Sequence, residues 1–188
     1  MSDIKGQQRA RRTGPGMLVA VAAAAFLLAG CDDDPEADVA ARLCGILDPA
    51  VAAEATGGAV ELTGFGGGNL DAKRRQGNGV DCSVATAGGE RRFTIVTMDF
   101  SDQADREAMR KQFADESAGS DVCAPRTGEP VGYVCRLADE TRISVLFPDR
   151  FVRVYGEARV NGQPPDPEAL IAVARNVDAN LRAFDEGR

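Results

Sequence analysis

The side chains that usually carry out chemistry in proteins are unevenly represented in this sequence of 188 residues. It has 29 aspartates and glutamates and five cysteines, but no histidine. Without histidine, neither a Ser-His-Asp triad nor a Cys-His pair can form, and imidazole metal sites are excluded. The Gly-x-Ser-x-Gly pattern of the nucleophile elbow is also absent. Carboxylate and sulfur chemistry remain.

One acidic segment has the residue types of a metal site. Asp99, Asp102, Asp105 and Glu107 carry the oxygen ligands that calcium prefers, but their spacing does not match an EF-hand and no glycine turns the loop. We interpret them as the end of a strand and the acidic first turn of a helix. Paired carboxylates also hydrolyse glycosides, although the absence of tryptophan argues against a sugar-stacking cleft. No metal and no cofactor is expected.

The N-terminal residues have the pattern of an export signal, with four basic residues before an apolar run, Met17 to Leu28. The run is about a dozen residues long, whereas a membrane-spanning helix needs roughly twenty. It ends at Leu28-Ala29-Gly30-Cys31, which resembles the lipobox of bacterial lipoproteins. The resemblance implies a cleaved signal peptide (1–30), lipid on the Cys31 thiol and an acidic tether (31–36). An ordinary secretory signal and a twin-arginine signal are the alternatives.

Removal of residues 1–30 changes the charge and the cysteine count. It takes away four basic and one acidic residue from the 22 and 29 of the full chain, which leaves a net charge of −10. Such a chain repels nucleic acid, so we expect no nucleic-acid partner. With Cys31 lipidated, four cysteines remain in an oxidising compartment, which predicts two disulfides.

Four cysteines allow three pairings. We favour Cys44–Cys82 and Cys123–Cys135, because Cys123 and Cys135 flank one short loop that contains proline and glycine. A zinc site is the rival interpretation, but the sequence has no Cys-x-x-Cys and no histidine.

The elements that must position these residues follow from hydrophobic spacing. Two adjacent strands joined by Gly88-Gly89 predict a hairpin in which Cys82 lies opposite Ile95 and Val84 opposite Phe93. The glycine-rich segment 64–79 has no apolar periodicity and predicts a mobile loop. We expect helices over 37–46, 49–56, 102–117 (with Ser101 as N-cap) and 167–184, and strands over 59–63, 80–87, 90–98, 131–137, 141–147 and 151–160.

These elements predict a single α+β domain over 37–188. Its sheet is antiparallel, with five to six strands, and its helices pack on one face in the order α-βββ-α-βββ-α. Two disulfides are expected within it.

The stretch Leu43 to Ala52 resembles the opening of a family of actinobacterial surface lipoproteins that is known only as a domain of unknown function. A second cysteine on a strand follows in that family, and Cys82 matches it. The family usually has tryptophan two places later, where this chain has Val84. The hairpin over 141–160 and the final alanine-rich helix are similar as well. The resemblance implies a lipid-anchored domain with a Cys44–Cys82 bridge, and it brings no catalytic residues.

Two surfaces are candidates for binding. Lys73, Arg74 and Arg75 form a basic tip that would dock an anionic partner such as a cell-wall polymer, unless they are merely a solvated loop. Tyr133, Phe151 and Tyr155 would line a small-ligand groove on the outer face of the sheet, unless they pack beneath a helix.

The expected function is therefore that of a non-catalytic lipoprotein held on the extracytoplasmic face of the membrane by lipid on Cys31. It would bind an unidentified envelope protein or a small ligand. The alternatives are an accessory or regulatory subunit of a membrane complex and an envelope hydrolase that uses paired carboxylates.

Overall fold

The computed structural model describes residues 39, 41–58, 61–68, 70–77, 79–157 and 164–187, with no side chain for Arg75. All of these residues belong to one unit, 33–188. The expected signal peptide, Cys31 and tether lie outside the described residues. Among the helices that the structure describes, none combines the length and the apolarity of a membrane span.

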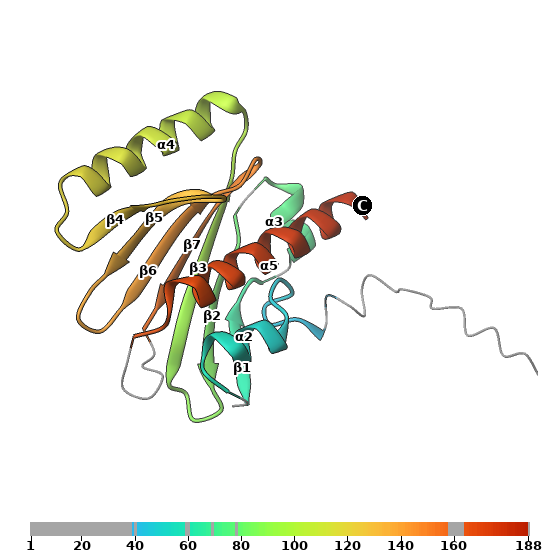
Figure 1. Ribbon diagram of the computed structural model, residues 1–188. Coiled ribbons are helices and arrows are strands. Elements are labelled where there is room, and N and C mark those ends of the chain that lie inside the picture. Colours follow the sequence, from blue (N-terminus) through green and yellow to red (C-terminus); the bar gives the residue numbers. More distant parts are fainter. Residues whose placement is uncertain are drawn as a thin grey trace, which may run out of the picture. The chain divides into compact units, whose positions relative to one another are not determined.

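The sheet has seven strands, all paired antiparallel, in the order β1-β2-β3-β7-β6-β5-β4 (Figure 1). This confirms an α+β fold with an antiparallel sheet, but the expected five to six strands were too few. The strands are β1 (Leu62–Gly66), β2 (Asp81–Thr86), β3 (Arg91–Asp99), β4 (Cys123–Arg126), β5 (Val131–Arg136), β6 (Thr141–Leu146) and β7 (Arg150–Gly156).

The strand that the sequence did not predict is β4, which was expected to be part of a loop. It is short and contains Pro125, a residue that cannot donate to a sheet ladder and is confined to edges. It nevertheless pairs with β5, and Cys123 lies directly opposite Cys135. A disulfide joins these two residues, so the bridge holds the edge strand in place.

The hairpin of β2 and β3 has the expected register. Cys82 lies opposite Ile95, and Val84 lies opposite Phe93. Gly89 in the turn has a φ of 82°, a value that favours glycine. The four paired side chains are buried in the main core. Cys82 also forms the second disulfide, with Cys44, so both bridges have the pairing that we favoured.

The helices differ more from expectation. They are α2 (Pro49–Ala55), α3 (Leu70–Arg75), α4 (Gln103–Ala118) and α5 (Pro167–Glu186). The helix expected over 37–46 is wrong in its second half, because Cys44 and Gly45 have φ values of 52° and 75°, which an α-helix does not contain. The N-cap of α4 is Asp102 instead of Ser101; its carboxylate accepts from the Asp105 N–H at 2.9 Å.

Helices cover both faces of the sheet, which corrects the expectation of a single covered face. Figure 1 shows α2 and α5 on one side and α4 on the other. The reason lies in the strands. On β7, Val152 and Val154 point into the core beneath α5, whereas Phe151 and its partner on β6, Leu146, pack with Phe113 of α4. Both faces of these strands are apolar in part, so each face needs a cover.

Candidate functional site

The expected basic tip does not form as an exposed cluster. Segment 64–79, where a mobile loop was expected, contains the end of β1 and all of α3, and α3 turns Arg74 inward. The Arg74 side chain is only 7% exposed and forms ion pairs with Asp99 and Asp185. Lys73 reaches Asp81, with Nζ 3.1 Å from Oδ1. Arg75 has no described side chain, so its part in the tip is not placed.

Arg74 belongs to a buried ion network, which we define as Arg74, Arg150 and Arg182 with Asp99, Asp178 and Asp185. Arg150 lies at its centre with 3% of its side chain exposed. Its Nε lies 3.2 Å from Asp178 Oδ1, and its Nη2 lies 3.4 Å from Asp185 Oδ2. The network joins α3 and α5 to the ends of β3 and β7, so it has a structural role.

Burial sets the protonation behaviour of this network. Desolvation raises the pKa of Asp178 above its ordinary value, against the opposing effect of Arg182 and Arg150. For Arg74, desolvation lowers the pKa, but hydrogen bonds to Asp185 and Asp99 outweigh it and leave the pKa raised. Each described arginine of the network faces at least one carboxylate, so the network offers no cationic position for a ligand.

Two of the three predicted groove aromatics pack beneath a helix. Tyr133 is 2% exposed, and Phe113 of α4 lies edge-on to its ring with centroids 4.9 Å apart. The rings of Phe113 and Phe151 are tilted, with centroids 5.4 Å apart. Tyr155 remains partly exposed, and the Arg142 guanidinium lies 5.0 Å from the centre of its ring. The three aromatics therefore do not form one groove.

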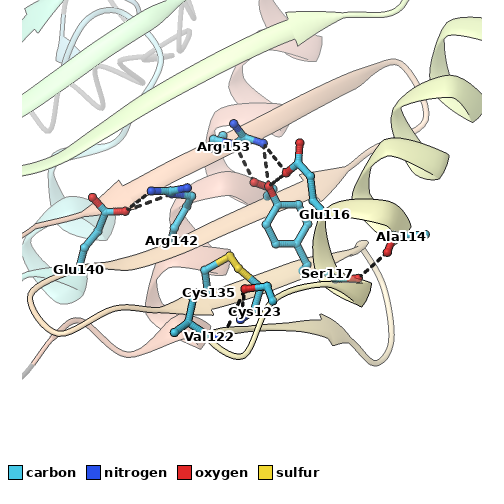
Figure 2. The surroundings of a disulfide bond; sticks show 12 residues. Ala114, Glu116, Ser117, Val122, Cys123, Cys135, Glu140, Arg142 and Arg153 are labelled. Carbon is cyan, nitrogen blue, oxygen red and sulfur yellow. Dashed lines mark hydrogen bonds and ion pairs between the residues drawn. A yellow bond between two sulfur atoms is a disulfide. The ribbon is translucent and has the colours of Figure 1, made fainter.

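A polar cluster surrounds the Tyr133 hydroxyl. This hydroxyl donates to Glu116 Oε2 at 2.5 Å and accepts from Arg153 Nη2 at 2.8 Å. Figure 2 shows Arg153 and Glu116 pointing toward one another above the Cys123–Cys135 bridge. The hydrogen bond from Tyr133 lowers the pKa of Glu116, whereas burial raises the pKa of Tyr133. The cluster joins α4 to the sheet, and its polar atoms already bind one another.

The carboxylates of the acidic segment also have partners within the protein. Asp99 belongs to the buried ion network, Asp102 caps α4, and Asp105 accepts from the Ser101 N–H at 3.2 Å. In the described part of the chain, no three cysteine or acidic side chains converge as a metal site would require.

One cavity lined by described residues lies between α4, α5 and two turns at the same end of the sheet. It has a volume of about 520 Å³, within the range of small-ligand pockets. We name it the arginine groove and define it by its lining. The charged lining residues are Arg106, Glu129 and Arg175, and the apolar ones are Pro130, Leu146, Phe147 and Pro148.

Backbone carbonyls hold the two groove arginines in place. Arg106, in the first turn of α4, donates from Nε to the Phe147 carbonyl at 3.3 Å. Arg175, near the middle of α5, donates from Nη2 to the Glu129 carbonyl at 2.8 Å. The loop that carries Glu129 is held in turn by Arg126, which donates to the Pro130 carbonyl at 3.1 Å. Two helices and two turns thus position the groove.

The groove arginines differ from the network arginines in their partners. No carboxylate of the described residues forms an ion pair with Arg106 or Arg175. Each has an acid nearby in sequence, Asp102 for Arg106 and Asp178 for Arg175, but these acids have other partners. Asp102 caps α4, and Asp178 binds Arg150 and Arg182. The groove can therefore offer guanidinium N–H donors to a bound molecule.

No sequence pattern predicted this groove. Its residues come from four segments with no shared motif, and the local spacing pairs both arginines with acids. Only the tertiary structure shows that those acids are occupied elsewhere.

A smaller cavity of about 290 Å³ lies between α2 and the start of α5. Its polar side chains are Glu54, Asp166 and Glu168. Asp166 is the N-cap of α5, and its carboxylate accepts from the Glu168 N–H at 3.2 Å. Glu168 Oε2 lies 3.6 Å from Arg126 Nη2. Two of the three carboxylates therefore have partners within the protein, which makes this cavity the weaker candidate.

Comparison of the chain with family models, with curated proteins and with solved structures finds no match.

Proposed function

We propose that this protein is a non-catalytic, lipid-anchored domain of the cell envelope that binds a small ligand in the arginine groove. The observation that carries the proposal is the groove itself: a ligand-sized cavity beside two guanidinium groups that no described carboxylate pairs. The two disulfides suit an oxidising compartment, which supports export. Lipid on Cys31 would then hold the domain at the membrane.

Ligand extraction tests the binding proposal. The full chain is purified from its own membranes, and native mass spectrometry is compared with denaturing mass spectrometry to reveal a small molecule that is lost on unfolding. We expect Pro148→Trp, at an exposed residue that lines the groove, to abolish the extra mass. Val122→Trp is the matched control, because Val122 is exposed and does not line the groove.

An equal ligand load in Pro148→Trp and in the wild type would place the bound molecule elsewhere. If the wild type carried no small molecule, and crosslinking in membranes captured a defined protein instead, the binding proposal would give way to the accessory-subunit hypothesis.

The anchor needs its own test, because Cys31 lies outside the described residues. We expect the membrane form to begin at Cys31 with acyl chains attached, and Cys31→Ala to release the protein from membranes. The intact mass of the membrane form checks this. A chain that keeps residues 1–30 and carries no lipid would refute the anchor without affecting the groove.

A second candidate function, an accessory or regulatory subunit of a membrane complex, is favoured by the open part of the sheet. Phe65 on β1 and Met98 on β3 are 58% and 41% exposed. The strand registers place both on the face that carries α4. A photoreactive residue at position 98 would crosslink to the partner subunit, whereas one at exposed Val122 would not.

A further inference from the structure

We propose that the ligand of the arginine groove is an amphipathic organic anion. Its acidic group would bind Arg106 and Arg175, and its apolar body would lie against the prolines, Leu146 and Phe147. The inference rests on the proposed function, since it names the chemical class that this groove would take. A carboxylate and a phosphate monoester share the required chemistry, and the experiment below separates them.

Charge is the first argument. The full chain has a net charge of −7. The groove lining has two arginines and one glutamate, and therefore a net positive charge. Because charged groups of one sign concentrate counter-ions in a concave site, an acidic molecule is the ligand that this lining attracts.

Donor geometry is the second argument. A guanidinium has five N–H donors in a planar fork, and it suits a carboxylate or a phosphate better than a neutral group. One N–H of Arg106 binds the Phe147 carbonyl, and one N–H of Arg175 binds the Glu129 carbonyl. These bonds fix the orientation of both side chains, so a ligand does not have to order them and their remaining N–H groups stay available.

The remaining lining explains why the ligand should be amphipathic. Pro130, Leu146, Phe147 and Pro148 carry no polar side-chain atom, so they cannot satisfy a fully hydrated ion such as inorganic phosphate. An apolar body placed against them would leave water, which is favourable at roughly 25 cal/mol per Å² of apolar surface.

The test uses the full chain in neutral phosphatidylcholine nanodiscs and ligand-observed NMR. Benzoate and phenyl phosphate carry an acid on an apolar ring, benzyl alcohol removes the charge, and inorganic phosphate removes the ring. We expect benzoate or phenyl phosphate to bind most tightly, and the stronger of the two identifies the acidic group. Added sodium chloride should weaken their binding and leave that of benzyl alcohol unchanged.

Three variants and one control assign the binding to the groove. Arg106→Gln and Arg175→Gln should each weaken anion binding by about tenfold, the effect of losing a charge-assisted hydrogen bond. Arg136→Gln is the matched control, since Arg136 is an exposed arginine with no described ion pair and lies outside the groove. Glu129→Gln should strengthen binding by about threefold, because it removes a like charge from the lining. A merely damaged fold could not strengthen binding.

Different outcomes separate the inference from the proposed function. If benzyl alcohol and benzoate bound equally tightly and Pro148→Trp abolished the binding of both, the inference that the ligand is an anion would be overturned. The proposal that the groove binds a ligand would stand. Anion binding that is unaffected by Arg106→Gln, Arg175→Gln and Glu129→Gln would overturn the inference as well. Binding of none of the probes up to their solubility limits would count against both proposals.

Discussion

Arginine occupies two contrasting regions of this protein, the buried ion network and the arginine groove. In the network, Arg150 is almost wholly buried and has Asp99, Asp178 and Asp185 around it. In the groove, Arg106 and Arg175 bind backbone carbonyls, and no described carboxylate pairs with them. The same side chain stabilises the fold in one place and is available to a ligand in the other.

The two regions differ because the nearby aspartates form ion pairs in the network and not in the groove. Asp178 lies three residues after Arg175 on α5, yet its carboxylate turns to Arg150 and Arg182. Asp178 is therefore not available to form an ion pair with Arg175. We infer that the pairing of Asp178 with Arg150 and Arg182 both completes the buried ion network and leaves the groove positively charged.

The largest expected effect comes from the centre of the network. Arg150→Gln should lower the free energy of unfolding by about 3–5 kcal/mol, because it leaves buried carboxylates without their charge partner. Urea unfolding followed by circular dichroism at neutral pH measures the change. If Arg150→Gln unfolded at the wild-type urea concentration, the network would not be the structural region that we describe.

The next effect concerns the Tyr133 cluster, where the partly buried Arg153 has a carboxylate, Glu116, and the hydroxyls of Tyr133 and Ser144 as partners. Tyr133→Phe should lower the free energy of unfolding by about 1–2 kcal/mol through the lost bonds to Glu116 and Arg153. Tyr155→Phe is the control, because the Tyr155 hydroxyl has only a long contact of 3.4 Å with Arg153. Equal stability of the two variants would contradict the prediction.

The same cluster predicts a pH dependence. Because folding lowers the pKa of Glu116, its stabilising contribution is present above its unfolded value of 4.5. It is lost as the pH falls through the folded value. Urea unfolding as a function of pH should therefore show a smaller acid loss of stability in Tyr133→Phe than in the wild type.

Sequence reasoning succeeded where a pattern is local. Alternating apolar residues and the Gly88-Gly89 turn predicted the β2–β3 register, and the cysteine spacing favoured both bridges. It failed where tertiary contacts decide. α3 forms in a glycine-rich segment because Leu70 is buried in the core and Arg74 is held by the network.

The candidate site was the least predictable part of the molecule. Lys73, Arg74 and Arg75 are adjacent in sequence, which drew attention to a basic tip, but the structure turns Arg74 inward. Arg106 and Arg175 are far apart in sequence and each has an acidic neighbour. Local spacing does not show that Asp102 caps a helix or that Asp178 pairs with distant arginines.

A smaller effect is expected from the acid that the two regions share. Asp178→Asn should lower the free energy of unfolding at neutral pH by only about 1 kcal/mol, because the desolvation cost of the buried charge offsets its attraction to Arg150 and Arg182. The wild-type carboxylate has a pKa raised by burial, so its contribution is fully present below its unfolded value of 3.8. It is lost as the pH rises through the folded value. The difference between variant and wild type in urea unfolding should therefore be larger in acid than at neutral pH.

The smallest expected effect is at Arg175, and it defines the contrast most sharply. Arg175 is exposed, and its one described bond is to a backbone carbonyl, so Arg175→Gln should change the free energy of unfolding by no more than about 0.5 kcal/mol. Urea unfolding beside Arg150→Gln measures this. A cost as large as that of Arg150→Gln would make Arg175 a structural clamp between α5 and the Glu129 loop. The contrast between the buried ion network and the arginine groove would then disappear, and with it the reason to expect an anion in the groove.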